Sequence, residues 1–119
     1  DSLLKDKDSR QAVINFNQPK HKKLGVKDFV CTLSIQYLIR KDKLISICNM
    51  RSNDLIYGFC NDIPFFSHLQ RSVLLELNKR EFKKGKLKLG PMYHTAGSMH
   101  VYEKHFNMID KIVEEYENE

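Results

Sequence analysis

Three side chains that suit nucleophilic chemistry at an anionic ligand lie on or just after two apolar stretches of the sequence. Cys31 stands near the start of the first stretch, 29–39, and Arg51 and Ser52 follow the second, 44–50. A guanidinium beside a thiol favours the thiolate, which is the nucleophilic form. The same guanidinium and a serine hydroxyl can also hold a phosphate. A lone cysteine in a strand is more often a small core residue. A nucleophilic role for Cys31 therefore requires that its side chain and that of Arg51 lie close together.

The sequence between the two stretches predicts that they do meet. Both stretches are rich in aliphatic and β-branched residues, and the polar segment 40–43 between them is typical of a β-hairpin turn. With a two-residue turn at Lys41-Asp42, Cys31 faces Ser52 on the opposite strand; with a three-residue turn it faces Arg51. Either register brings a nucleophile and an anion-binding pair to one end of the hairpin.

The other elements that must support this hairpin form a mixed α and β domain. Residues 11–16 are expected to form a strand, and 87–102 an extended segment broken at Gly90-Pro91. A helix is expected to begin at a cap on Asn61 or Asp62, with Pro64 in its first turn. The linker behind that helix is expected to end at Gly85. The buried stripe of this helix is Phe66, Leu69, Val73 and Leu77, and that of a last helix is Phe106, Ile109, Val113 and Tyr116.

Composition restricts the class of protein. The chain has 119 residues, of which 41% are hydrophobic and 29% charged, which is typical of a single globular domain over 1–119. No apolar run is long enough for a transmembrane helix or a signal-peptide core. The three cysteines are odd in number and form no C-x-x-C pair, which favours a reducing cytoplasm. The net charge of +5 suggests an anionic partner, either nucleic acid or a phosphorylated small molecule.

Four motifs, in this order along the chain, resemble those of the thymidylate synthase superfamily. They are Ser9-Arg10, the cysteine segment 28–32 with Gln36-Tyr37, the loop 50–55 (Met-Arg-Ser-Asn-Asp-Leu) with Gly58, and 97–102 (Gly-Ser-Met-His-Val-Tyr). The residues at 36–40 and 49–54, together with Gly97-Ser98, are more similar to those of phage deoxycytidylate hydroxymethylases than to those of ordinary synthases. The resemblance covers most of the chain, since the motifs span residues 9–102.

The resemblance implies both a fold and a reaction. The fold is α+β, a mixed sheet with a long helix packed on it, here as the C-terminal, cysteine-bearing portion. The reaction is one-carbon transfer from 5,10-methylenetetrahydrofolate to C5 of a pyrimidine deoxynucleoside monophosphate, with dCMP 5-hydroxymethylation favoured. Thymidylate synthase acting on dUMP is the first alternative, and a non-catalytic or RNA-binding fragment is the second. If the source is a phage, the protein is expected in the host cytoplasm.

The resemblance also implies a role for each matching residue. Cys31 adds to C6 of the pyrimidine, Arg51 and Ser52 hold the 5′-phosphate, and His100 and Tyr102 bind the sugar 3′-hydroxyl. Asp54 meets the base and the folate pterin, although it also suits a cap for the turn 54–57. Arg10 reaches the phosphate in the neighbouring subunit of a homodimer with shared active sites.

One position is expected to read the base. In Gly58-Phe59-Cys60-Asn61-Asp62, Asp62 stands where synthases carry asparagine. A protonated carboxyl matches the hydrogen-bonding edge of cytosine, and so does a carboxylate that faces N3-protonated cytosine. A carboxylate that faces uracil places two acceptors opposite each other. The alternatives are a plain helix cap at Asp62, or a one-residue shift that makes Asn61 the reader and restores uracil.

The sequence also departs from the family pattern. Gln11 stands where many synthases have a second arginine, and Ser98 replaces their usual aspartate. The family's catalytic glutamate and folate-stacking tryptophan lie upstream of the arginine strand, and no residue here matches them. Because the chain also opens without a methionine, we expect it to complete an active site only with another segment.

Overall fold

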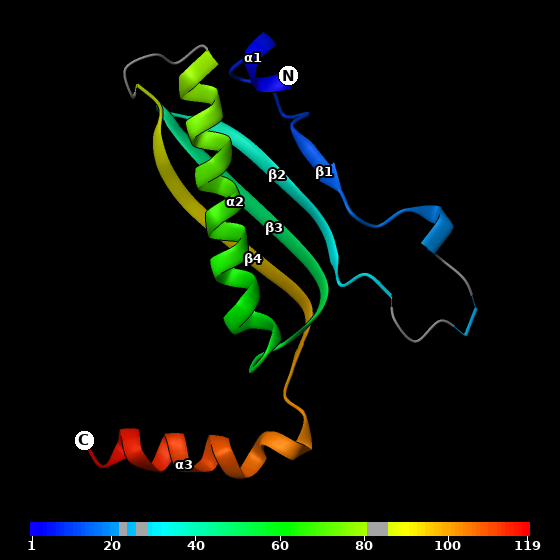
Figure 1. Cartoon of the computed structure of the whole chain (residues 1–119), viewed down its shortest axis with the longest axis vertical. Helices are drawn as coiled ribbons and strands as arrows, with labels where there is room; N and C mark the ends of the chain where they lie inside the picture. Colours follow the sequence, from blue (N-terminus) through cyan, green and yellow to red (C-terminus); the bar gives the residue numbers. More distant parts are fainter. Residues whose placement is uncertain (22–23, 26–28, 81–85) are drawn as a thin grey trace.

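The protein is described here by a computed structural model that covers residues 1–21, 24–25, 29–80 and 86–119. Over these residues it consists of one mixed sheet, a long helix on one face of the sheet and a separate C-terminal helix (Figure 1). Asp28 of the cysteine segment and the expected linker end at Gly85 lie outside the described residues. The elements in chain order are α1 (Ser2–Lys5), β1 (Val13–Asn15), η1 (Pro19–His21), β2 (Thr32–Arg40), β3 (Lys43–Asp54), α2 (Gly58–Arg80), β4 (Lys88–His100), η3 (Glu103–His105) and α3 (Phe106–Glu117).

The predicted hairpin is confirmed as β2 and β3. The strands lie in the order β1-β2-β3-β4; β2 pairs antiparallel with both neighbours, whereas β3 and β4 are parallel and joined through α2. Arg40 pairs with Lys43, so the turn has two residues, and both Lys41 and Asp42 have positive φ (50° and 58°). Such a turn has the twist that antiparallel strands require.

A β-bulge changes the register at the other end of this hairpin. Ser34 pairs with Asn49, but Thr32 pairs with Met50, so one extra residue is inserted on β2. The backbone N–H of Arg51 consequently donates to the carbonyl of Cys31 at 2.8 Å. Cys31 therefore faces Arg51, and the expected pairing with Ser52 is wrong even though the turn has two residues.

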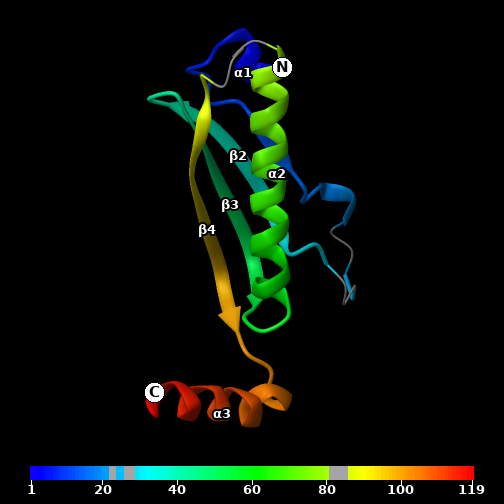
Figure 2. The same ribbon diagram turned by 60° about the vertical axis from the view of Figure 1, so that its left-hand side comes forward.

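Helix α2 covers one face of the sheet, and no described helix covers the opposite face (Figures 1 and 2). Its buried residues are Phe66, Gln70 and Leu77, which pack on the side chains of β2 and β3 that alternate toward it. The expected start of this helix at Asn61 or Asp62 is wrong, because α2 begins at Gly58 and Pro64 lies inside it. The physical reason is an earlier cap, since the Asp54 carboxylate accepts the N–H groups of the preceding turn.

The expected break at Gly90-Pro91 is a bulge within a continuous β4. Leu44 pairs with Leu89 and Ser46 with Met92, so Gly90 and Pro91 together face one residue of β3. A Cβ at Gly90 would lie 2.7 Å from the Leu44 carbonyl oxygen, which explains the glycine. The buried amide of Gln70 donates to the carbonyls of Leu44 (2.9 Å) and Gly90 (3.2 Å) and anchors the bulge to α2.

Helix α3 lies beyond the end of the sheet, away from α2 (Figure 1). Its expected buried stripe is wrong within this chain: Phe106 is 50% exposed, Val113 46% and Tyr116 78%, and only Ile109 is partly buried. The apolar periodicity is present, but no described segment of the chain packs on it. Across the part of the chain that the structure describes, no helix combines the length and apolarity needed to cross a membrane.

Candidate active site

A pocket of about 570 Å³ opens where β2 begins and where β3, β4 and the first turns of α2 come together. It brings together all but one of the residues singled out from the sequence. Those that line it are Cys31, Arg51, Ser52, Asp54, Asp62, His100 and Tyr102. Residues far apart in the sequence converge because the parallel strands β3 and β4 end at the same edge of the sheet, next to the helix that connects them.

Arg51 binds the backbone of the segment that carries Cys31. Its Nε donates to the Val30 carbonyl at 3.0 Å and its Nη2 to the Phe29 carbonyl at 2.7 Å. The guanidinium also lies over the Phe29 ring, 5.2 Å from its centroid. The Cys31 thiol makes only a long contact, 3.8 Å, to the same Phe29 carbonyl. Cys31 is thus an exposed thiol on a segment held by a cation, whereas Cys48 is buried in the core.

Hydroxyl and imidazole groups form the wall of the pocket next to this cation. Ser52 Oγ lies 3.4 Å from His100 Nδ1, and the His100 and Tyr102 rings pack edge to face with centroids 5.0 Å apart. His100 and Tyr102 do not share a strand face as their spacing suggests, because β4 ends at His100, but their rings still lie together at the pocket. The three side chains offer several hydrogen-bonding groups to a ligand in the pocket.

The carboxylate of Asp54 organises the turn that precedes α2. It accepts the backbone N–H groups of Ile56 (3.2 Å) and Tyr57 (3.1 Å), so its expected role as a turn cap is confirmed. Desolvation alone would raise the pKa of Asp54. The hydrogen bonds from Ile56, Tyr57 and Gly58, with the nearby charge of His105, outweigh it and hold the pKa below its ordinary value. Asp54 is therefore an ionised group at neutral pH.

Asp62 and Asn61 have different environments. Asp62 lines the pocket and is half-buried, whereas Asn61 is exposed and its amide donates to the Tyr57 carbonyl at 2.6 Å. Since α2 begins at Gly58, Asp62 is not its cap, and that alternative is wrong. Burial raises the pKa of Asp62, and the positive charge of a protonated His94 opposes the rise.

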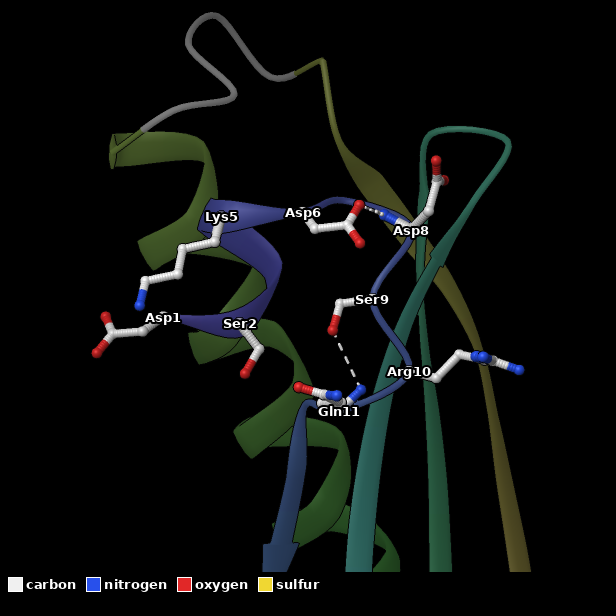
Figure 3. A pocket seen from close by; sticks show the side chains of 8 residues that line it. All are labelled: Asp1, Ser2, Lys5, Asp6, Asp8, Ser9, Arg10 and Gln11. Atoms are coloured by element: carbon white, nitrogen blue, oxygen red, sulfur yellow. Dashed lines mark hydrogen bonds between the residues drawn. The ribbon is translucent and has the colours of Figure 1, made fainter.

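Arg10 lies outside this pocket. It lines a second cavity, of about 630 Å³, near the N-terminal residues, where the Gln11 N–H donates to Ser9 Oγ at 3.1 Å and the Asp8 N–H to Asp6 Oδ1 at 2.9 Å (Figure 3). Its side chain points away from those of Lys5 and Asp1, over the side of β2 (Figure 3). Its carbonyl accepts the Gln36 amide at 2.8 Å, which fixes the backbone at this point. Arg10 therefore does not reach the pocket that Cys31 of the same chain lines.

Two residues of the site region carried no signal that sequence reasoning used. Asn53 is buried and lines the pocket, although in the sequence it is only the variable position of the 51–54 motif. His94 contacts Asn53 from β4, with its Nε2 3.3 Å from Asn53 Nδ2. The sequence separates these residues widely, and the side-chain contact that joins them is visible only in the fold.

One pocket at the end of the mixed sheet is lined by an exposed thiol, a guanidinium, hydroxyl groups and two carboxylates, a set of groups suited to nucleophilic chemistry on an anionic ligand. Comparison with known families then specifies the membership. Residues 1–119 match the family model of thymidylate synthase, so the chain belongs to the thymidylate synthase family.

Individual relatives agree with this membership. The deoxycytidylate 5-hydroxymethyltransferases of Enterobacteria phages T4, T2 and T6 are each 35% identical over 112 residues, which is 91% of this chain and 45% of theirs. A thermostable thymidylate synthase A from Bacillus subtilis superimposes with a TM-score of 0.76 at 21% identity, covering 92% of this chain and 36% of that one. These matches confirm the predicted superfamily, its phage subgroup and the fold. The chain spans less than half the length of the relatives it matches.

Proposed function

We propose that the chain is the cysteine-bearing part of an enzyme that transfers a one-carbon unit to C5 of a pyrimidine deoxynucleotide, most specifically a deoxycytidylate 5-hydroxymethyltransferase. The observation that carries this proposal is the pocket in which Cys31, Arg51 and Asp62 lie together. The phage relatives that share 35% of its residues bear that name. Incubating the intact natural protein with dCMP and 5,10-methylenetetrahydrofolate tests it, with 5-hydroxymethyl-dCMP identified by mass as the expected product.

In the proposed reaction Cys31 is the nucleophile. Its thiolate adds to C6 of the ring, which leaves C5 electron-rich, and C5 then forms a bond to the one-carbon unit. Arg51 holds the segment that carries the thiol, because its guanidinium donates to the carbonyls of Val30 and Phe29. Loss of the C5 proton and departure of tetrahydrofolate from the transferred carbon then leave an exocyclic methylene at C5. Water adds to this methylene while the thiolate leaves C6, which restores the C5–C6 double bond of the ring.

The co-substrate 5,10-methylenetetrahydrofolate supplies the one-carbon unit. Of the described residues, Asp54 is the one proposed to hold its pterin, since its ionised carboxylate lies at the pocket wall. The sequence has no tryptophan to stack on the folate. The glutamate that completes the site is proposed to come from a segment upstream of residue 9.

Arg51 and Ser52 are proposed to bind the 5′-phosphate. Two nitrogens of Arg51 already donate to the backbone, and within the described residues its Nη1 has no such acceptor, which leaves a donor for the ligand. Ser52 adds a hydroxyl next to it, and His100 and Tyr102 are proposed to meet the sugar 3′-hydroxyl.

Replacing Arg51 tests the phosphate site. Arg51→Ala is expected to weaken binding of dCMP by on the order of a hundredfold, because a charge-assisted hydrogen bond contributes about 1.5–3 kcal/mol and the cysteine segment also loses its anchor. The measurement is calorimetric titration of the intact protein with dCMP. Arg71→Ala, which removes an exposed arginine of α2, is the matched control and should bind normally. Equal losses in both variants would indicate diffuse charge attraction in place of a site.

A second copy of the chain is the proposed partner. The sheet carries exposed apolar side chains such as Tyr93 (55%) and Met99 (44%), and α3 exposes most of its apolar stripe. A homodimer would cover such surfaces. Arg10, which does not reach the pocket of its own chain, is proposed to enter that of the partner.

Thymidylate synthesis is the second candidate, favoured by the fold shared with the Bacillus subtilis enzyme. It differs in base and product, since dUMP replaces dCMP and hydride replaces water in the last step. The carboxyl of Asp62 argues for cytosine. Turnover of dUMP but not dCMP by the intact protein would favour this alternative.

A further inference from the structure

His94 lies directly behind one wall of the pocket. Its Nε2 is 3.3 Å from Asn53 Nδ2 and 3.2 Å from Met50 Sδ, and both Asn53 and Met50 line the pocket. His94 comes from β4, where it pairs with Cys48 of β3. His94 therefore contacts residues of the pocket wall but does not itself line the pocket.

The face of α2 that packs on His94 includes Asp62. The ring of His94 lies 5.6 Å from that of Phe59 and 6.2 Å from that of Phe66. Phe59, Asp62 and Phe66 are spaced three and four residues apart and so share one face of the helix. Asp62 therefore stands between the two aromatic contacts, and the charge of His94 acts on its carboxyl.

The surroundings of Asn53 fix the role of the His94 ring nitrogen. Asn53 is 3% exposed, and its Oδ1 lies against Gly58, where an added Cβ would collide with it. The atom of Asn53 that contacts His94 is Nδ2, which can only donate, so in this contact Nε2 accepts and the ring proton resides on Nδ1. The opposite tautomer would leave a buried amide unpaired and gain only the weak thioether acceptor of Met50.

We propose that His94 is a positioning residue for base selection. By accepting a hydrogen bond from the Asn53 amide, its ring nitrogen fixes the orientation of that amide in the pocket wall beside Asp62. The inference rests on the proposed function, because it concerns the pyrimidine edge that Asp62 is proposed to read. The titratable groups that face His94 are Asp62 from α2 and the Cys48 thiol from β3.

Two substitutions separate hydrogen bonding from packing. His94→Phe keeps a ring against Phe59 and Phe66 but removes the acceptor, and His94→Gln restores an acceptor without the ring. We expect His94→Phe to lower the ratio of kcat/KM for dCMP to that for dUMP about tenfold, and His94→Gln to keep it within about threefold of the parent. His68→Phe, at an exposed histidine of α2, is the matched control and should leave the ratio unchanged.

A spectroscopic readout decides the inference even if the intact protein acts on neither nucleotide, which would count against the proposed function alone. Nitrogen NMR of the parent protein should show the proton of the neutral His94 ring on Nδ1, and the Asn53 amide protons should shift in His94→Phe. A proton on Nε2 would overturn the inference. So would a His94→Phe variant whose nucleotide ratio matches that of the parent, since the ring would then act by packing only.

Discussion

Cys31→Ser is expected to abolish turnover, with a loss on the order of 10⁴-fold or more, because removing the nucleophile of a covalent mechanism removes the whole pathway that depends on it. The covalent adduct between protein and pyrimidine should disappear from the mass spectrum. Serine is nearly isosteric with cysteine, and Cys31 is exposed, so thermal stability should be unchanged. Adduct mass and melting temperature, measured on the same preparation of intact protein, separate lost chemistry from lost folding.

Cys60 provides the matched control for this experiment. It is also exposed, and its thiol contacts only the Leu55 carbonyl, at 3.7 Å. Cys60→Ser should therefore keep both adduct formation and turnover. Alkylation that modifies Cys60 while Cys31 stays inert, or an adduct that survives Cys31→Ser, would assign the nucleophile elsewhere.

Local patterns were sufficient to predict the hairpin that brings Cys31 and Arg51 together, whereas the other site residues were expected there from the family resemblance. The polar turn at 40–43 joins two β-branched stretches, and this pattern determines that Cys31 and Arg51 meet whichever register applies. The motifs at 51–54 and 97–102 end adjacent parallel strands, so they also meet at one edge of the sheet. These features follow from chemistry encoded within a few residues of the chain.

The errors arise where a tertiary contact overrides a local signal. Asn61 and Asp62 are good cap residues before Pro64, but the Asp54 carboxylate caps the chain earlier, so α2 starts at Gly58 and contains the proline. The bulge that moves Cys31 from Ser52 to Arg51 has no marker in its own sequence. The stripe on α3 is genuine, but periodicity does not reveal what covers it.

Base choice depends on a small number of hydrogen bonds at Asp62. The helix that carries it begins at Gly58, so its carboxyl is not needed as a cap and lies at the pocket. Asn61 is the alternative reader, but its side-chain amide donates to the Tyr57 carbonyl and it does not line the pocket. The substitution of a single carboxyl by an amide therefore tests the proposed preference for cytosine.

Asp62→Asn is expected to move the preference of the intact protein from dCMP toward dUMP by at least tenfold. An amide oriented for uracil accepts from N3–H and donates to O4. Facing cytosine in the same orientation, it places its acceptor opposite the N3 acceptor and its donor opposite the amino group. Each such mismatch costs about 1–3 kcal/mol in a dry site, and 1.4 kcal/mol is a factor of ten. The change should appear in kcat/KM, because the same contacts stabilise the charge that develops as Cys31 adds to the ring.

The pH dependence of kcat/KM in the parent, relative to that in Asp62→Asn, gives a second test of base reading. Burial raises the pKa of Asp62, with His94 opposing the rise, so the acid form that shares a proton with cytosine N3 is present below that pKa and is lost as the pH increases through it. The asparagine side chain does not titrate in this range. Dividing kcat/KM of the parent for dCMP by that of the variant cancels the dependence on Cys31, and this quotient should decrease with increasing pH. A quotient independent of pH, together with an unchanged preference for dCMP, would mean that Asp62 does not read the base.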